Sequence, residues 1–289
     1  MLRPCRLLLI IFLALLSRIA TAQSRVDCNA LDSRILKQPV HYCVMLPSDY
    51  DATASTHPAK RYPIVYFLHG LGDNEQSLFK SGAWGQVEEL RRQHKIGEFL
   101  IAAPQGDRTF YVNSADGKVR YSDFFLHEFM PFIEEHYPIR RERDSRAITG
   151  LSMGGYGALR FAFAYPELFG SVSAQSAALM AMRSGAPVGK LLGNVFGDPI
   201  DAAHWKKNDP FFLAKLHKAA ISRLAIYFNC GREDEYGFES GAEALDRQLR
   251  AEGIRHEFHL YPGNHSPTYF LAHFGETMQF HSRVFQASK

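Results

Sequence analysis

The sequence lacks a hydrophobic run long enough to cross a bilayer. Its most apolar stretch, residues 7–16, has ten uncharged residues, whereas a membrane-spanning helix needs about twenty. This stretch follows Arg3 and Arg6 and precedes Ala20-Thr21-Ala22, an order that is typical of a secretory signal peptide. We therefore expect residues 1–22 to be a signal peptide, and we expect a secreted or periplasmic protein with no stable membrane anchor.

The sequence also lacks an excess of charge of either sign. It has 33 basic and 30 acidic residues, and three of the arginines (Arg3, Arg6 and Arg18) lie in the expected signal peptide, which has no acid. Residues 23–289 are therefore close to neutral. Because nucleic acids and anionic membrane surfaces attract strongly basic proteins, this balance argues against either of them as the main partner.

Cysteine is scarce, and motifs for metal or phosphate binding are absent. Beyond residue 22 only Cys28, Cys43 and Cys230 remain. In an oxidising compartment Cys28 and Cys43 could join the first two strands, which would stabilise the fold by about 3 kcal/mol, or they could stay reduced. Neither a His-Glu-x-x-His motif nor a glycine loop with its lysine is present, and His256 and His259 would point to opposite faces of one strand. We expect no metal site.

Short apolar runs alternate along the chain with segments of helical spacing. Strands are predicted at residues 40–46, 64–68, 99–103, 147–149, 171–174, 224–230 and 256–261, and helices at 84–94, 123–136, 156–164, 210–219, 239–251 and 267–280. This order predicts an α/β fold in one domain (residues 23–289), with a mostly parallel central sheet and helices on both faces. The less regular residues 176–208 are predicted to form an insertion over the active site.

The most informative motif is Gly150-Leu151-Ser152-Met153-Gly154, which lies between a predicted strand and a predicted helix. A Gly-x-Ser-x-Gly in this context is typical of a nucleophile elbow, a tight turn that exposes a serine hydroxyl above the sheet. A glycine-rich turn that merely packs closely is the alternative. The helix that follows would direct its first N–H groups at negative charge formed beside Ser152.

A serine nucleophile needs a histidine as base and a carboxylate that orients the histidine. Asp234 follows the strand at 224–230, and His265 follows the strand at 256–261. Because parallel strands end at the same edge of a sheet, both side chains are predicted to lie near Ser152. Glu233 and Glu235 are alternatives to Asp234.

A second loop is expected to help stabilise negative charge on the substrate. His69-Gly70-Leu71-Gly72 follows the strand at 64–68, and this loop supplies a backbone N–H in such enzymes. We expect the N–H groups of Leu71 and Met153 to form the oxyanion hole. The His69 ring is expected to bond to nearby backbone.

These segments resemble one family of α/β-hydrolases. The resemblance rests on residues 67–72, on Gly-Leu-Ser-Met-Gly-Gly at 150–155, on Cys230-Gly231 ahead of Asp234 and on Asn264-His265. The family is that of esterases related to S-formylglutathione hydrolases, feruloyl and acetylxylan esterases and mycolyltransferases, and the resemblance covers about residues 40–280. It implies an α/β-hydrolase fold and acyl transfer through a serine ester without a cofactor. It places the nucleophile, acid and base at Ser152, Asp234 and His265.

The expected function is therefore hydrolysis of small-molecule or carbohydrate carboxylic esters. An acyltransferase that passes the acyl group to a sugar or another alcohol, and a non-catalytic binding module on the same fold, are the alternatives. Candidates for the substrate pocket are the side chains of Trp84, Arg108, Phe110, Tyr111 and Tyr236. Asn264-His265-Ser266 is also a glycosylation sequon, and a sugar on Asn264 would crowd His265.

Overall fold

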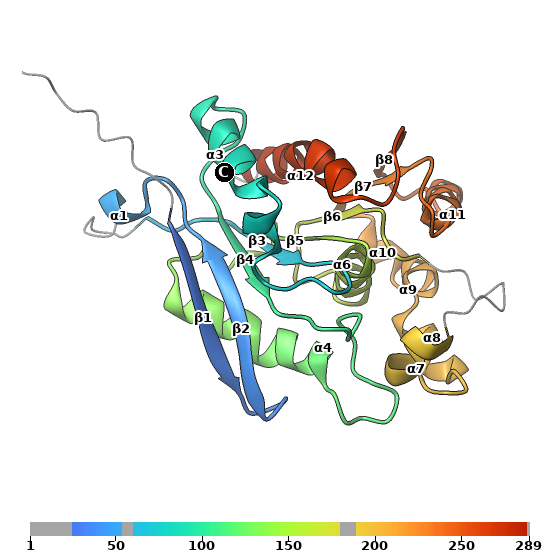
Figure 1. Ribbon diagram of the computed structural model, residues 1–289. Coiled ribbons are helices and arrows are strands. Elements are labelled where there is room, and N and C mark those ends of the chain that lie inside the picture. The colour runs from blue at the N-terminus through green and yellow to red at the C-terminus, as the bar shows by residue number, and fades with distance from the viewer. Residues whose placement is uncertain (1–24, 54–59, 180–188, 288–289) are drawn as a thin grey trace, which may run out of the picture.

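An eight-stranded sheet forms the centre of the fold (Figure 1). The computed structural model describes residues 25–53, 60–179 and 189–287, so the predicted signal peptide lies outside the described residues. The spatial order of the strands is β1-β2-β4-β3-β5-β6-β7-β8. Their bounds are β1 (Val26–Ser33), β2 (Gln38–Met45), β3 (Ile64–Leu68), β4 (Leu100–Pro104), β5 (Arg146–Leu151), β6 (Ser171–Gln175), β7 (Ala225–Gly231) and β8 (Glu257–Tyr261).

The strands from β4 across to β8 all run parallel, and the antiparallel β1–β2 hairpin extends the sheet beyond β4. Every residue of β3, β4 and β6 is buried. Such strands are covered by helices on both faces, which explains why their sequences are continuous apolar runs instead of alternating ones. The predicted α/β-hydrolase sheet is confirmed.

Helices cover both faces of the sheet. One face packs against α2 (Ser77–Lys80), α3 (Ala83–Arg92) and α12 (Pro267–Ala287) through Val65, Phe67 and Ile101. Tyr66, Leu68 and Ile148 face a larger cluster on the opposite side. The helices there are α4 (Tyr121–Phe124), the π-helical turn η1 (Phe125–Phe129), α5 (Met130–His136), α6 (Met153–Ala164), α7 (Gly189–Phe196), α8 (Ala202–Asn208), α9 (Pro210–Leu216), α10 (Lys218–Ile221) and α11 (Phe238–Ala251).

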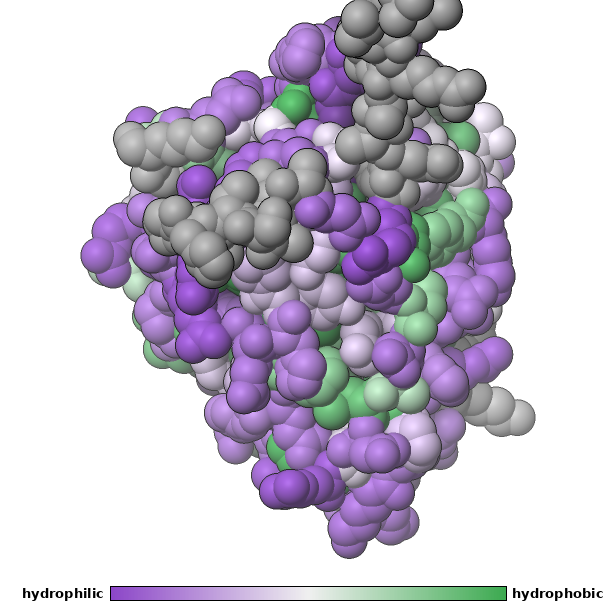
Figure 2. Space-filling view, turned by 90° about the vertical axis from the view of Figure 1, so that its left-hand side faces the viewer, coloured by the Kyte–Doolittle hydropathy of each residue, from purple (hydrophilic) through white to green (hydrophobic). Residues whose placement is uncertain are grey.

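Two short elements complete the fold, namely α1 (Tyr50–Thr53) and the 3-10 turn η2 (Arg143–Ser145). None of the helices within the described residues is both long and apolar enough to cross a membrane. On the face shown in Figure 2, which carries the β1 edge of the sheet, the described residues are mostly hydrophilic and the hydrophobic ones form small separate groups.

The segment predicted as an irregular insertion contains two helices, α7 and α8. Asp201 begins α8 by accepting hydrogen bonds from the N–H groups of Ala203 and His204. Phe196 and Trp205 pack together with ring centroids 4.7 Å apart, and the Tyr156 hydroxyl on α6 donates to the carbonyl of Asn208 at 2.7 Å. The described part of the segment thus packs against α6. Residues 180–188 lie outside the described residues.

Candidate active site

Ser152 lies at the sharp turn between β5 and α6. Its backbone has φ 55° and ψ −118°, a left-handed conformation that a non-glycine residue adopts only under constraint. The turn also brings backbone segments into contact. A Cβ atom at Gly154 would overlap the carbonyl oxygen of Leu68, and one at Gly150 would overlap the backbone of Gly154. Both glycines of the motif are therefore required by the geometry of the turn.

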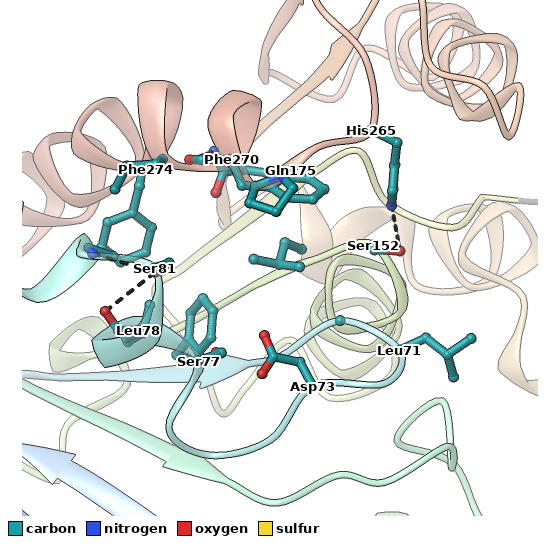
Figure 3. A pocket seen from close by; sticks show the side chains of 16 residues that line it. Leu71, Asp73, Ser77, Leu78, Ser81, Ser152, Gln175, His265, Phe270 and Phe274 are labelled. Carbon is teal, nitrogen blue, oxygen red and sulfur yellow. Dashed lines mark hydrogen bonds between the residues drawn. The ribbon is translucent and has the colours of Figure 1, made fainter.

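The structure brings the three predicted catalytic side chains together from three loops at the same edge of the sheet. The Ser152 Oγ lies 2.9 Å from His265 Nε2, and His265 Nδ1 lies 2.8 Å from Asp234 Oδ2. The Asp234 side chain is fully buried, and only 10% of the His265 side chain is exposed. Figure 3 shows His265 pointing down at the Ser152 hydroxyl. A carboxylate can only accept, so Nδ1 carries the ring proton and Nε2 is left to accept the serine proton.

Asp234 is held as an anion by its surroundings. Burial acts to raise the pKa of its carboxyl group, but the hydrogen bond and charge of His265 and the backbone N–H groups of Tyr236 and Phe238 outweigh burial and lower it. The Tyr236 N–H donates to Oδ1 at 3.1 Å, and the Cys230 thiol donates to Oδ2 at 3.7 Å. An ionised Asp234 would stabilise a positive charge on the His265 ring.

The two neighbouring acids have a different role. Glu235 accepts a hydrogen bond from the backbone N–H of His265 at 2.8 Å, and Glu233 accepts one from the N–H of Gly263. Both carboxylates therefore tie the loop after β7 to the loop after β8, Glu235 through the backbone of His265 and Glu233 through that of Gly263. Asn264 is exposed beside His265.

The loop after β3 is fixed by the ring of His69. The Gly106 N–H donates to His69 Nε2 at 2.7 Å, so Nδ1 carries the proton and donates to the carbonyl of Gly70 at 2.8 Å. Burial lowers the pKa of His69, which keeps the ring neutral. In a trans peptide the carbonyl and the next N–H point in opposite directions. Fixing the Gly70 carbonyl therefore fixes the direction of the Leu71 N–H.

A second N–H group is supplied by the elbow itself. Met153 is the first residue of α6, and the first N–H groups of a helix have no acceptor within the helix. They also carry the positive end of the helix dipole. Leu71 lines the same cavity as Ser152, and Met153 follows Ser152 as the first residue of α6, so an oxyanion hole formed by their N–H groups stays a prediction.

A cavity of about 220 Å³ opens from Ser152 and runs between α2 and α12 (Figure 3). Its walls are mostly apolar, and the carboxylate of Asp73 points into it. The lining residues are Phe67, Gly70, Leu71, Asp73, Ser77, Leu78, Ser81, Ala83, Leu151, Ser152, Gln175, His265, Pro267, Phe270, Leu271 and Phe274.

None of the five side chains proposed for the pocket lines this cavity. Trp84 stacks on Phe79 at 5.7 Å, Arg108 is exposed, and Phe110 is buried against Tyr156. Tyr111 is fully buried, and its hydroxyl donates to the carbonyl of His69 at 2.9 Å. Tyr236 is 67% exposed and lies beside His265, with ring centroids 4.9 Å apart.

The cavity wall that sequence reasoning missed comes from the first turns of α12. Phe270, Leu271 and Phe274 follow His265 directly in the chain, at helical spacing. Apolar residues at helical spacing directly after the predicted base are the sequence feature that indicates a pocket wall here. Among the described residues, no group of three or more His, Cys, Asp or Glu side chains is arranged to hold a metal ion.

A strained serine between a strand and a helix, followed in the chain by an acid and a histidine at the ends of later parallel strands, defines the class of α/β-hydrolases. Residues 33–281 match the family model described as "Putative esterase". The chain belongs to this family, and it is a carboxylic ester hydrolase.

Individual proteins are similar to the chain in sequence or in fold. The chain is 27% identical over 270 residues to an acetyl esterase of Caldicellulosiruptor saccharolyticus, covering 87% of this chain and 96% of that protein. A solved ferulic acid esterase shares the fold with a TM-score of 0.79 at 24% identity, covering 91% of this chain and 99% of the other. The fluorophosphonate-binding serine hydrolase F of Staphylococcus aureus has a TM-score of 0.77 at 21% identity, covering 90% and 98%.

Proposed function

We propose that the protein hydrolyses carboxylic esters through an acyl-enzyme on Ser152. The observation that carries the proposal is the hydrogen-bonded chain from Ser152 through His265 to Asp234. Ser152 Oγ attacks the ester carbonyl carbon while His265 Nε2 takes its proton. The tetrahedral intermediate then expels the alcohol, which leaves with that proton. Water then attacks the acyl-enzyme carbonyl while His265 takes its proton and returns it to Ser152 Oγ, which restores the free serine and releases the carboxylic acid.

The oxyanion of each tetrahedral intermediate accepts hydrogen bonds from the N–H groups of Leu71 and Met153. Because both groups are held by the backbone, they need no reorganisation when charge develops on the substrate. A preorganised donor of this kind contributes about 10²- to 10³-fold in rate.

We assign the cavity to the acyl group and the open side of His265 to the alcohol. The acyl group stays on the enzyme between the two steps, which suits a mostly apolar pocket, whereas the alcohol must leave with a proton from His265. The exposed ring of Tyr236 lies on that open side, stacked on Phe238 at 5.6 Å. Its aromatic face offers a surface against which the alcohol part of the ester, for example a sugar ring, can pack.

The size of the cavity limits the acyl group. Its volume is about 220 Å³. We expect short acyl chains to be preferred, because a chain longer than the cavity must extend past its mouth. A secreted location remains part of the proposal, and the disulfide between Cys28 and Cys43 supports an oxidising compartment.

The test is hydrolysis of 4-nitrophenyl acetate, butyrate, octanoate and ferulate by purified protein. We expect butyrate to be preferred over octanoate and Ser152→Ala to lose about 10⁴-fold or more in kcat. Ser240→Ala, which changes an exposed serine on α11, is the matched control. Undiminished hydrolysis by folded Ser152→Ala would refute the mechanism. A sugar alcohol added to the same assay shows whether part of the acyl group passes to an acceptor other than water.

A further inference from the structure

We propose that Asp73 selects the charge of the acyl group: the cavity accepts neutral acyl groups and repels anionic ones, including the carboxylate that the reaction releases. This inference rests on the proposed function, because it assigns the cavity to the acyl group. It names Asp73 as a specificity-determining residue that takes no part in the chemical steps.

The first observation is the composition of the cavity wall. Asp73 is its only acidic residue, and the wall contains no lysine or arginine. The carboxylate points into the cavity (Figure 3). Apart from the His265 ring, the other side chains that line the cavity are apolar or carry hydroxyl or amide groups. A substrate placed in the cavity therefore meets one fixed negative charge and no positive charge beyond that which His265 acquires during the reaction.

The second observation is that nearby cations do not neutralise Asp73. Within the described parts of the chain, Asp73 forms no ion pair, and its Oδ1 accepts from the backbone N–H of Asn74 at 2.9 Å. Lys80 donates instead to the Asn74 side chain at 3.3 Å. The field of Asp73 also reaches the oxyanion loop. Burial lowers the pKa of His69, and the hydrogen bond to the Gly70 carbonyl together with the negative charges of Asp73, Glu75 and Asp107 partly opposes that shift.

The negative charge of Asp73 also affects release of the product. A neutral ester becomes a carboxylic acid, which loses its proton at neutral pH. The N–H groups that hold the oxyanion would also hold this anionic product and slow its release. A carboxylate across the cavity raises the free energy of the bound anion and leaves the neutral substrate unaffected. Asp73 therefore favours product release as well as neutral substrates.

The experiment compares two esters that differ in charge but not in shape. Ethyl 4-methylpentanoate is neutral, and monoethyl succinate replaces its isopropyl end with a carboxylate. We expect the wild-type protein to have the higher kcat/KM on the neutral ester. In Asp73→Asn, which keeps the acceptor for the Asn74 N–H, we expect the preference to shrink about fivefold, because Asp73 is exposed and part of its field is screened. Added salt should shrink the preference of the wild-type protein but not that of Asp73→Asn.

A second measurement uses the product and does not depend on turnover of either ethyl ester. Butyrate should inhibit hydrolysis of 4-nitrophenyl butyrate about fivefold more strongly in Asp73→Asn than in the wild-type protein, while inhibition by neutral butanamide should stay the same. Asp32→Asn, which removes an exposed carboxylate from the distant strand β1, is the matched control and should change neither quantity. Unchanged charge preference and unchanged butyrate inhibition in Asp73→Asn would overturn the inference. Because Ser152→Ala tests the mechanism separately, that result would leave the proposed function standing.

Discussion

The backbone N–H and the backbone carbonyl of Ser152 are both hydrogen-bonded. Its N–H donates to the carbonyl of Gln175 at 2.9 Å, and its carbonyl accepts from the N–H groups of Tyr156 and Ala178, each at 3.0 Å. These bonds come from β6, α6 and the segment that follows β6. They compensate the left-handed conformation, which costs of order 1–3 kcal/mol. These hydrogen bonds therefore hold the proposed nucleophile in this conformation without a substrate.

His69 should control kcat although it touches neither substrate nor triad. We expect His69→Leu to lower kcat about 10²-fold with little change in KM, because the Leu71 N–H would lose its fixed direction and the oxyanion is present only after attack. His69→Asn can still donate to the Gly70 carbonyl and should recover part of the loss. Steady-state kinetics on 4-nitrophenyl butyrate measure both values.

A thermal melt of each His69 variant shows that it is folded before its kcat is interpreted. A folded His69→Leu protein with wild-type kcat would show that the Leu71 N–H does not depend on the His69 ring. An equal loss in the Leu and Asn variants would show that the ring shape, and not its hydrogen bond, holds the loop.

The meeting of the Ser152, His265 and Asp234 side chains could be predicted from the sequence, whereas the lining of the cavity could not. Ser152, Asp234 and His265 each follow a strand of a parallel sheet, so their position in the chain already places them at one edge. The direction of a side chain that leaves a helix or a loop depends on packing, which the sequence does not reveal. Trp84 turns toward Phe79, and the positive φ of Tyr111, 59°, turns its ring into the core.

Helix α12 has two roles along its length. Its first turns supply Phe270, Leu271 and Phe274 to the cavity wall, so the helix that closes the substrate pocket begins two residues after His265. Further along, the His281 ring lies between the hydroxyls of Ser171 and Ser173 on β6, at 2.8 Å and 2.7 Å. The ring is fully buried, so both of its nitrogens depend on these two serines.

The buried His281 should make the protein less stable in acid. Burial lowers the pKa of His281 to about 3, whereas an unfolded histidine has a pKa of about 6.5. Between these values the unfolded state binds the proton and the folded state does not, so the free energy of unfolding falls as pH drops below 6.5 and is unaffected above it. At pH 4.5 this group costs about 3 kcal/mol relative to pH 8.

Urea unfolding at pH 8 and pH 4.5 tests this effect. His281→Gln should be less stable than the wild-type protein at pH 8, because it packs less well, but it should lose about 3 kcal/mol less on acidification. His127→Gln changes an exposed histidine and should keep the wild-type dependence. The same acid sensitivity in His281→Gln and the wild-type protein would assign it to other groups.

Elements buried on both faces could be predicted closely, and those at the periphery could not. The run at 64–68 is β3 itself, since every residue of that strand meets a helix. The helix predicted at 123–136 is present, but a π-helical turn at Phe125–Phe129 interrupts it. Helices α7 and α8 were missed because glycines and prolines around them indicate turns. They are held by Phe196, which packs against Tyr156 of α6, and by Trp205, which packs against Phe196.

On the scale of the whole molecule, the disulfide and the candidate active site lie at different parts of the sheet. Strands β1 and β2 form an antiparallel pair at one edge, and β4 and β3 separate them from the elbow at β5. Cys28 and Cys43 face each other in the register of this pair and form a disulfide. Because the bond links the edge strand β1 to β2, it stabilises an edge of the sheet that lies several strands away from the elbow.

Loss of this disulfide should therefore lower stability without changing the chemistry. The bond closes a loop of 15 residues, which the chain-entropy model values at about 3 kcal/mol, so Cys28→Ser with Cys43→Ser should lower Tm by roughly 6–12 °C. At 25 °C the double variant should keep the wild-type kcat/KM on 4-nitrophenyl butyrate. A reductant should lower the Tm of the wild-type protein and leave that of the double variant unchanged, which separates the bond from the serine substitutions. Equal melting temperatures with and without the bond would show that β1 is held by its ladder to β2 alone, whereas a fall in kcat/KM would connect this edge to Ser152 across the sheet.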